Sequence, residues 1–395
     1  MKSFRNFDWM PQRLSDFLFH LSSPSTPPEF IKEATVFDIH NRKPSAAPEH
    51  PSVDPKAFPV THSLITRARK EMPNENLHKR IAHGFKTAFH AMSGEDEKTR
   101  KAKVGESHKV WDHFVKQRGY KSGKNISMLG ENGKTKKSTG EGVHTKGLTL
   151  APHTTSGLHG FDVCPRASSE CRKNCLGLTA GGNKQYPDSA LSSKVLRTHF
   201  VAHHPEHAAR MIDHEVGNHA KSAKKKGFIP GVRMNVTSDF SWEHHAPELF
   251  HRHKDVQFYD YTKMHNRVGH PNLPKNYHLS LSHTGANHAE SNDHHAAEAL
   301  HKGHVVAMVY HRGKDVPHPT HVEDMKTGKR FPVANGDDDD NTFDRHAHHG
   351  LTPGKAGHGV VSGLKLKGVK NEAAGHFANK VDHDGIIRIN HPKTS

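Results

Sequence analysis

After residue 145 the chain alternates short apolar runs with helix-like segments, and this alternation constrains its fold more than any other feature. Such alternation predicts an α/β fold, in which a parallel sheet carries its helices on the outside. We expect a partial (βα)6 TIM-like barrel, with an open doubly wound sheet as the alternative arrangement of the same units. The predicted strands are residues 147–152, 231–238, 256–262, 277–282, 304–311 and 359–364.

The first part of the chain differs from this alternating region in its residue pattern. Proline-rich stretches come first, and a segment in which Leu77, Ile81, Phe85 and Phe89 recur every four residues then predicts an amphipathic helix. The barrel-like domain therefore has a loosely structured, helix-containing N-terminal extension. The predicted division is an extended, poorly ordered region at 1–72, a small helical and basic region with a linker at 73–144, an α/β cysteine-containing domain at 145–370, and a C-terminal tail at 371–395.

Composition argues against a membrane or secreted protein. The mean hydropathy is −0.82, and 32% of residues are hydrophobic. No run approaches the roughly eighteen apolar residues that a membrane span requires. The charged N-terminal stretch lacks the uninterrupted apolar run of a secretory signal. We therefore expect a cytoplasmic protein, in which clustered free thiols stay reduced.

The only three cysteines of the chain lie close together in the sequence, in the segment FDVCPRASSECRKNCLGLTAGG. Cys164, Cys171 and Cys175 form a C-x6-C-x3-C pattern, and such a cluster indicates a shared metal. Three thiolates leave one iron of a [4Fe–4S] cluster open, whereas a structural zinc ion needs a fourth ligand. His159 and His199 are the nearest candidates for that ligand. The iron–sulfur, the zinc and a metal-free interpretation all remain open at this point.

Polar side chains follow the predicted strands, where βα folds place their chemistry. One group, Arg233, Asn235, Ser238 and Asp239, belongs to the second predicted strand and its end. A second group follows the next strand and consists of Asp260, Tyr261 and Lys263. We expect both groups to face one active site together with the cysteine loop.

Several of these polar residues also have a purely structural interpretation. Ser238 or Ser241 is suited to cap a helix beginning near Trp242. Of Tyr259 and Tyr261, which alternate with Asp260 along a strand, one is expected to belong to the core.

The charge of the chain is positive overall and unevenly distributed. The formal net charge is +16, and residues 101–150 hold eleven Lys or Arg against four Asp or Glu. A basic surface favours phosphate-bearing partners, nucleic acid above all, although a solvated basic linker explains the same run. The acidic run Asp337 to Asp340 is interpreted either as a divalent-cation loop or as a solvated acidic loop.

Five consecutive blocks resemble those of an uncharacterised family of bacteriophage-encoded proteins: CPRASSECRKNCLGLTAGG, VRMNVTSDFSWE, FYDYTKMHNR, NYHLSLSHTG and PVANGDDDDNTF. The cysteine block is also similar to that of phage gene-product-88-like proteins, which share the Cys-Pro start and the cysteine spacing. More distantly, the architecture resembles iron–sulfur barrels of the radical S-adenosylmethionine type. Those enzymes usually carry C-x3-C-x2-C, so the first gap is longer here.

No function is established for either phage family. The cysteine cluster, the basic segment and the phage resemblance together lead to the hypothesis of a phage-encoded iron–sulfur protein in the host cytoplasm, radical S-adenosylmethionine-like and acting on a nucleotide or nucleic acid. Under this hypothesis the three cysteines hold the cluster, whose open iron binds S-adenosylmethionine. The implied cofactor-binding residues are Arg233, Asn235, Ser238, Gly181 and Gly182. The implied catalytic residues are Asp239, Asp260, Tyr261 and Lys263.

Two other functions stay open. One is a zinc-stabilised nucleic-acid-binding protein without catalysis, and the other is a virion or host-takeover interaction protein that uses an enzyme-like fold without chemistry.

Overall fold

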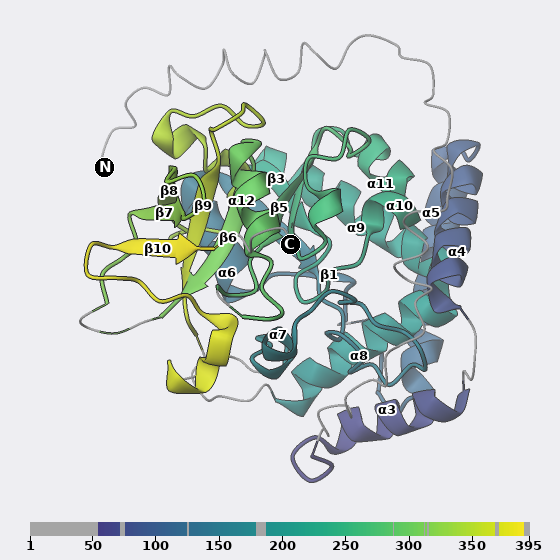
Figure 1. Ribbon diagram of the computed structural model, residues 1–395. Coiled ribbons are helices and arrows are strands. Elements are labelled where there is room, and N and C mark those ends of the chain that lie inside the picture. The colour runs from purple at the N-terminus through teal and green to yellow at the C-terminus, as the bar shows by residue number, and fades with distance from the viewer. Residues whose placement is uncertain are drawn as a thin grey trace, which may run out of the picture. The chain divides into compact units, whose positions relative to one another are not determined.

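The structure is a computed structural model that describes residues 54–71, 76–124, 126–178, 187–286, 288–311, 313, 316–367 and 371–390. The chain divides into two compact units, Met1–Ser45 and Ala46–Ser395, and the described residues all belong to the second. In that unit a ten-stranded sheet runs in the order β1-β2-β3-β4-β5-β6-β9-β8-β7-β10. Figure 1 shows the helices α4, α5 and α9 on one side of this sheet, with β7 and β10 near its far edge.

The strands are β1 Leu129–Gly130, β2 Val143–Leu148, β3 Ile229–Arg233, β4 Gln257–Thr262, β5 Tyr277–Ser282, β6 Val305–Tyr310, β7 His321–Asp324, β8 Arg330–Asn335, β9 Val360–Lys365 and β10 Ile386–Ile389. The α-helices are α3 Pro59–Glu71, α4 Leu77–Ser93, α5 Glu97–Lys116, α6 Gly133–Lys137, α7 Ser169–Lys173, α8 Asp188–His203, α9 Pro205–Lys225, α10 Trp242–His245, α11 Pro247–Arg252 and α12 Asp293–His301. The 3-10 helices are η1 Ser138–Glu141, η2 His265–Arg267, η3 Thr342–Asp344, η4 Ala347–His349 and η5 Glu372–Phe377.

Most neighbouring strands in the sheet are parallel. From β2 to β6 each strand pairs with the next one in the sequence, and β9 and β8 continue the parallel arrangement beyond β6. The antiparallel pairs are β1 with β2 and β7 with β8. The predicted α/β class is therefore confirmed. The sheet is not closed, so it does not confirm the predicted partial TIM-like barrel.

All six predicted strands overlap an observed strand. The prediction at 277–282 matches β5 residue for residue. The first two predictions, 147–152 and 231–238, extend beyond the ends of β2 and β3 into the loops that follow them. Those two loops carry the cysteines and Asp239, so the misplaced strand ends affect the candidate site.

The amphipathic segment predicted near residue 77 is helix α4. Asn76 caps it by accepting a hydrogen bond from the Lys79 backbone N–H at 3.1 Å. Its apolar stripe is buried, with Ile81 and Phe85 both 0% exposed. The helix belongs to the same hydrophobic core as α8, α9 and strands β3 to β5. The apolar spacing thus docks α4 onto the sheet-bearing part of the chain.

A close approach of α4 and α9 fixes their packing. A side chain at Gly84 would place its Cβ 2.4 Å from the ring of Pro205, the first residue of α9. Only glycine fits at that crossing.

Residues 59–71, which the sequence assigned to an extended region, form helix α3 instead. No helix among the described residues is long and apolar enough to cross a membrane.

Candidate functional site

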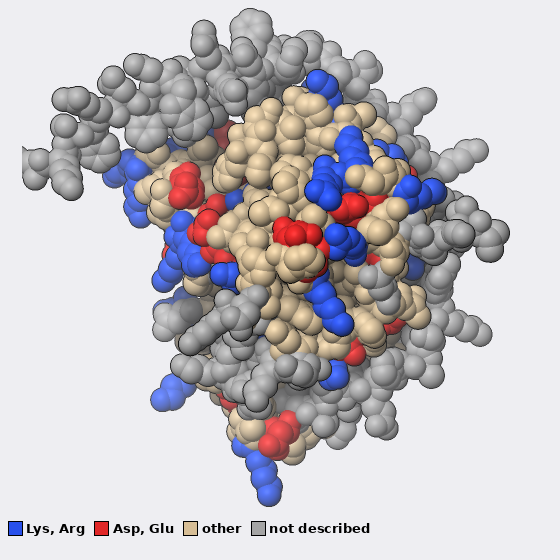
Figure 2. Space-filling model, turned by 60° about the vertical axis from the view of Figure 1, so that its left-hand side comes forward, with Lys and Arg blue, Asp and Glu red and all other residues tan. Residues whose placement is uncertain are grey.

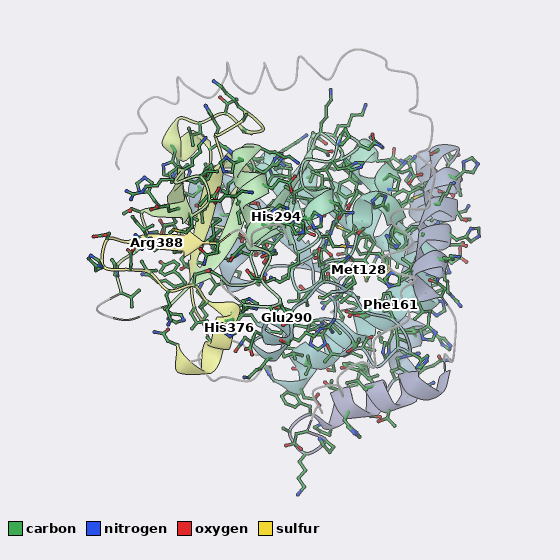
Figure 3. The ribbon with its side chains drawn as sticks, viewed as in Figure 1. Met128, Phe161, Glu290, His294, His376 and Arg388 are labelled. Atoms are coloured by element: carbon green, nitrogen blue, oxygen red, sulfur yellow. The ribbon has the colours of Figure 1, made fainter. Side chains whose placement is uncertain are left out.

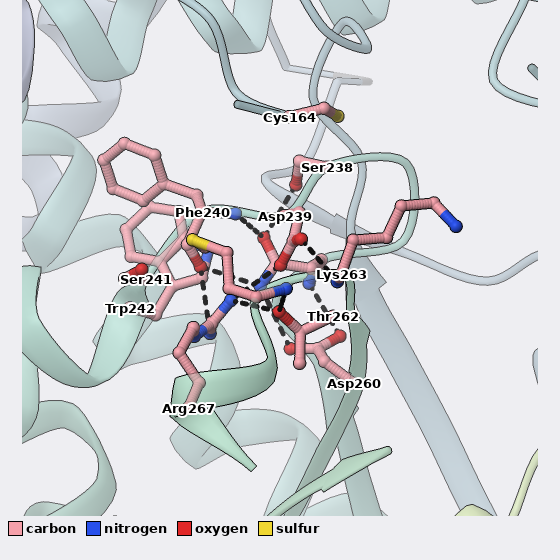
Figure 4. A network of polar contacts seen from close by, with 12 residues as sticks. Cys164, Ser238, Asp239, Phe240, Ser241, Trp242, Asp260, Thr262, Lys263 and Arg267 are labelled. Atoms are coloured by element: carbon pink, nitrogen blue, oxygen red, sulfur yellow. Dashed lines mark hydrogen bonds and ion pairs between the residues drawn. The ribbon is translucent and has the colours of Figure 1, made fainter. Parts of the chain in front are cut away.

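The candidate site is the carboxyl edge of the sheet, by which we mean the carboxyl ends of β2 to β5 and the loops that follow them. Because these strands are parallel neighbours, their carboxyl ends lie along one edge. Ligands of open α/β sheets bind in crevices outside this edge. Residues far apart in the sequence meet here, and Figure 4 shows one network of their polar contacts.

A buried arginine that the sequence analysis missed is the centre of that network. Arg267, in η2, donates to Asp239 at 2.6 Å and to both carboxylate oxygens of Glu243 at 2.6 and 2.8 Å. It also donates to Thr262 at 3.1 Å. Its side chain is 4% exposed. Burial raises the pKa of Glu243, but Arg267 outweighs that effect and holds the pKa below its usual value.

Asp260 points to the opposite face of β4 from its neighbours Tyr259 and Tyr261, as its position between them predicted. Its carboxylate is 0% exposed and accepts hydrogen bonds from the Asn235 backbone at 2.9 Å and from the Tyr277 hydroxyl at 2.9 Å. Burial raises the pKa of Asp260 to about 7. The carboxylate thus joins β3, β4 and β5 within the core, and a substrate cannot reach it from solvent.

Asn235 and Ser238 shape the loop after β3. The Asn235 side chain donates to the Phe240 carbonyl at 2.9 Å and accepts from the Phe240 N–H at 3.0 Å. Ser238 donates its hydroxyl to the Asn235 side-chain oxygen at 2.8 Å. Helix α10 begins at Trp242, where expected, but Ser241 at its N-cap makes no capping hydrogen bond. Ser241 thus holds the predicted N-cap position without a side-chain capping bond, and the capping interpretation is wrong for Ser238, whose hydroxyl bonds Asn235 instead.

Arg233 and the acidic run form a second buried ionic cluster, on the face of the sheet that carries Tyr259 and Tyr261. Arg233 pairs with Asp340 at 2.7 Å and lies 5.0 Å from the ring centroid of Tyr261. Arg345 pairs with Asp339 at 2.9 Å. Asp339 and Asp340 are 3% and 0% exposed, so neither interpretation of the acidic run holds for these two residues. They neutralise two buried arginines.

Tyr259 is the tyrosine that belongs to the core. It is 0% exposed, and its hydroxyl donates to Thr145 at 3.0 Å. Tyr261 is partly buried and donates to Asp340 at 3.4 Å.

Lys263 follows β4 and differs from the two arginines in its partners. Its backbone N–H donates to Asp239 at 2.8 Å, while its side-chain amine donates to the Ser282 hydroxyl at 3.0 Å and the His283 carbonyl at 3.2 Å. Both acceptors of the amine are neutral. In Figure 4 the Lys263 side chain points away from the ionic network. A cation held by neutral groups at this edge is suited to bind an anionic ligand.

The cysteine loop follows β2 and is held by polar contacts along its length. Asp162 accepts from the Cys164 backbone at 2.8 Å and pairs with Arg172 at 2.7 Å. Ser168 caps helix α7 by accepting from the Cys171 backbone at 3.2 Å. These contacts set the positions of the two cysteines within the loop.

Two further contacts connect this loop to the segments that follow β5 and β9. Ser169 donates its N–H and its hydroxyl to Glu290, which follows β5. Asn174 donates to the Ala374 carbonyl in η5 at 3.4 Å. Glu290 is labelled in Figure 3.

The thiols of Cys164 and Cys175 lie next to the loop after β3. The Cys164 sulfur accepts from the His153 N–H at 3.4 Å and lies 3.8 Å from the Thr237 carbonyl oxygen. The Cys175 sulfur accepts from the Gly177 N–H at 3.4 Å. Burial raises the pKa of Cys175 to about 11 and that of Cys164 well above its usual value.

The sulfur atoms of the three cysteines are not all within 4.8 Å of one another. In the described part of the chain, one group of potential metal ligands meets that spacing, and it consists of histidines and a glutamate. His199, a candidate fourth ligand, has its Nε2 atom 2.7 Å from the Ser156 carbonyl oxygen. Gly181 and Gly182 lie outside the described residues.

A separate hollow of about 300 Å³ lies on α5 and the loop after it. Its lining includes Lys109, Lys116, Lys124, His108 and His113. On the face shown in Figure 2, by contrast, basic side chains are interspersed with acidic and neutral ones. The basic segment predicted from the sequence thus contributes to a defined concave surface.

The sequence analysis named most residues of the carboxyl edge but missed Arg267, Glu243 and Asp340 as partners of those residues. Arg267 stands in a polar segment after a strand, and no local pattern distinguishes it from a surface arginine. One signal in the sequence could have indicated Arg267. Several acidic residues lie near strand ends, and a carboxylate buried there needs a cation as its partner.

Comparison with known proteins identifies the family of this chain. The family model described as Gene product 88 matches residues 124–380, which is more than half of the chain. The chain therefore belongs to this bacteriophage protein family, and the expected phage relationship is confirmed. No curated protein and no solved structure matches it.

Proposed function

We propose that this protein is a phage-encoded iron–sulfur enzyme that acts on a nucleotide or nucleic acid, with Cys164, Cys171 and Cys175 as cluster ligands. The observation that carries the proposal is the position of the cysteine loop at the carboxyl edge. The Cys164 sulfur lies 3.8 Å from the Thr237 carbonyl, just beyond the end of β3. Reactive groups of α/β enzymes gather at this edge, whereas a purely structural metal loop has no need to lie there.

The residues of the loop fit an iron–sulfur cluster in their donor type and surroundings. Thiolates are the usual ligands of such clusters, and hydrogen bonds to their sulfur atoms tune the potential. Cys164 and Cys175 each accept a backbone N–H at 3.4 Å. A cluster assigns each thiolate to a different iron, so it tolerates sulfur atoms that are not all within 4.8 Å of one another.

The same spacing disfavours a single zinc ion. Zinc–sulfur bonds of about 2.3 Å in a tetrahedron place the sulfur atoms only about 3.8 Å apart. The loop contacts made by Arg172 and Ser168 would have to change before three thiols met at one ion.

The proposed enzyme is radical S-adenosylmethionine-like. When bound, a reduced cluster with one open iron would supply the electron that cleaves S-adenosylmethionine. The chain's own contribution at this edge is a rigid set of loops and one cation, Lys263, whose amine has neutral acceptors. We propose that Lys263 binds an anionic group of substrate or cofactor, with Asp239 fixing its backbone at 2.8 Å.

Among the other predicted site residues, those with buried partners are proposed to position loops rather than contact substrate. Arg233, Asn235, Ser238 and Asp260 all have protein partners that use their polar atoms. Tyr261 is only partly buried, so it remains a candidate for substrate contact.

The run of strands from β2 to β6 supports a partial barrel as the finer description of the fold. Each of these strands lies parallel to the next in sequence order, as in successive units of a βα barrel.

The hollow on α5 supports a phosphate-bearing substrate. Lys109, Lys116 and Lys124 are exposed and line one concavity, together with Asp112, which pairs with Lys116 at 2.6 Å. Clustered lysines attract a nucleic-acid backbone by releasing its counterions, so binding there would weaken as salt rises.

The first experiment measures iron, zinc and acid-labile sulfide in protein purified without oxygen. About four irons and four sulfides per chain are expected for wild type. Cys171→Ser should lose them, while Lys263→Met should keep the cluster and lose S-adenosylmethionine cleavage. One zinc with no sulfide would refute the iron–sulfur proposal and favour a zinc-stabilised binding protein.

A second experiment tests the nucleic-acid part separately. The slope of log affinity against log salt concentration is measured for duplex DNA. Replacing Lys109, Lys116 and Lys124 by Gln should reduce its magnitude by about 2 to 3, at about 0.9 per phosphate contact. A control replaces three exposed lysines elsewhere, which are Lys326, Lys355 and Lys380. Equal slopes for both triple variants would exclude the hollow as the binding surface.

A further inference from the structure

We propose that His294, His295 and Glu298 form a binding site for a zinc ion, distinct from the cysteines. All three belong to helix α12, and their ligand atoms all lie within 4.8 Å of one another. No other group of three or more such side chains meets this spacing within the part of the chain that the structure describes. His294 is labelled in Figure 3.

The donor set fits zinc in kind and in number. Zinc is bound by histidine nitrogen and carboxylate oxygen, and two histidines with one glutamate are a known three-ligand set of zinc enzymes. Such sets leave the fourth position to water or substrate. His294 and Glu298 are exposed and His295 is partly buried, so solvent reaches the cluster. The site would therefore hold an accessible ion rather than a sealed structural one.

Neighbouring side chains already hold the ligands in place. The His265 ring stacks on His295, with centroids 3.4 Å apart and planes 8° apart. Lys302 donates to one oxygen of Glu298 at 2.6 Å, and the other oxygen lies 3.9 Å from His295 Nδ1. That Nδ1 atom is buried and has no hydrogen-bond partner in the described structure. A bound cation would supply the missing partner, and partners that orient metal ligands contribute to affinity.

The site lies on the carboxyl edge. Helix α12 follows β5, and its first residue, Asp293, has a carboxylate oxygen 2.6 Å from His283 Nε2. His265 belongs to η2, which follows β4. Glu290, three residues before α12, accepts a hydrogen bond from the Ser169 N–H at 3.0 Å, so the cysteine loop is near. A zinc ion here would lie on the same edge of the sheet as Lys263, whose amine donates to the His283 carbonyl at 3.2 Å.

The test is equilibrium dialysis of the full-length protein against zinc, with bound metal measured by mass spectrometry. The variant is His294→Ala with Glu298→Gln, which keeps His295 and its stacking on His265. The matched control is His348→Ala with His349→Ala. That pair is also adjacent and near an acid, with His348 at 3.9 Å from Asp344, but it belongs to no three-ligand group in the described residues.

Wild type and control should each bind one zinc per chain more than the His294/Glu298 variant, or bind it at least about 10-fold more tightly. Zinc held by the cysteines is common to all three proteins and cancels in the comparison. Glu298→Gln alone, with circular dichroism as the folding check, should show the same direction of change. Equal zinc binding by all of the proteins would overturn the proposal, whatever the iron content of the cysteine loop.

Discussion

Replacing Arg267 by Met should destabilise the protein strongly, because it leaves two buried carboxylates without their cation. Arg267 makes three hydrogen bonds of 2.6 to 2.8 Å to Asp239 and Glu243, and its side chain is 4% exposed. Removing one partner of a buried ion pair costs about 3 to 5 kcal/mol. We expect a loss in that range at pH 7, since methionine fills much of the volume but offers no donor.

The loss should also depend on pH. In the wild type the pKa of Glu243 lies below its usual value, so its contribution to stability is present above that value and is lost as pH falls through the folded pKa. Without Arg267, burial is the largest remaining effect and raises the pKa of Glu243. The variant is then more stable with Glu243 protonated and loses stability as pH rises. The difference in unfolding free energy between the two proteins should therefore be larger at pH 7 than at pH 4.

The assay is urea unfolding of both proteins at pH 4, 5, 6 and 7, with Arg330→Met as the matched control. Arg330 pairs with Glu323 at 3.2 Å but its side chain is 55% exposed. An exposed pair contributes about 0 to 1 kcal/mol. If Arg267→Met costs no more than Arg330→Met, or costs the same at every pH, the carboxyl edge is not held by this buried ionic network.

Two further perturbations test other parts of the fold. Arg210 pairs with the buried carboxylate of Glu95 and lowers its pKa to about 2, and Glu95→Gln removes that carboxylate. We expect the variant to lose about 2 kcal/mol of unfolding free energy at pH 7, a loss that disappears as pH falls from about 4.5 towards 2. Urea unfolding at a series of acidic pH values measures it. Gly285→Ala should destabilise by more than about 1 kcal/mol and loosen η5, because φ is +97° and the new Cβ would lie 1.5 Å from the His376 carbonyl oxygen; hydrogen exchange at residues 372–377 matching wild type would contradict this.

The sequence predicted the parallel core of the sheet because each of its strands is a short apolar run. The missed strands are β1, β7, β8 and β10. β1 has only two residues, and β10 is apolar, as IIRI, but only four residues long. β7 is the polar segment HVED, and β8 contains Pro332, which is unusual within a strand. The order of strands in the sheet also departs from their order in the sequence beyond β6, because β9 and not β7 lies beside β6. Which strand pairs with β6 depends on packing between segments remote in sequence, and the local pattern of apolar residues carries no information about it.

For the candidate site, strand ends predicted which residues gather at one edge but not what they contact there. Asp260 lies within β4 and Lys263 directly follows it, yet Asp260 is sealed in the core and the Lys263 side chain points away from the ionic network. The difference arises from partners remote in sequence, such as Tyr277 for Asp260 and Ser282 for Lys263. No pattern within ten residues distinguishes them.

The distribution of buried charge narrows where chemistry can occur on this edge. Arg233 and Arg267 are each matched by carboxylates at 2.6 to 2.8 Å, so their charge is already neutralised within the protein. Lys263 is held by a hydroxyl and a carbonyl, neither of which cancels its charge. An anionic ligand therefore gains more from Lys263 than from either arginine. Lys263→Met should accordingly weaken ligand binding while leaving the free energy of unfolding nearly unchanged. Loss of either arginine should lower the free energy of unfolding instead, with little direct effect on ligand binding.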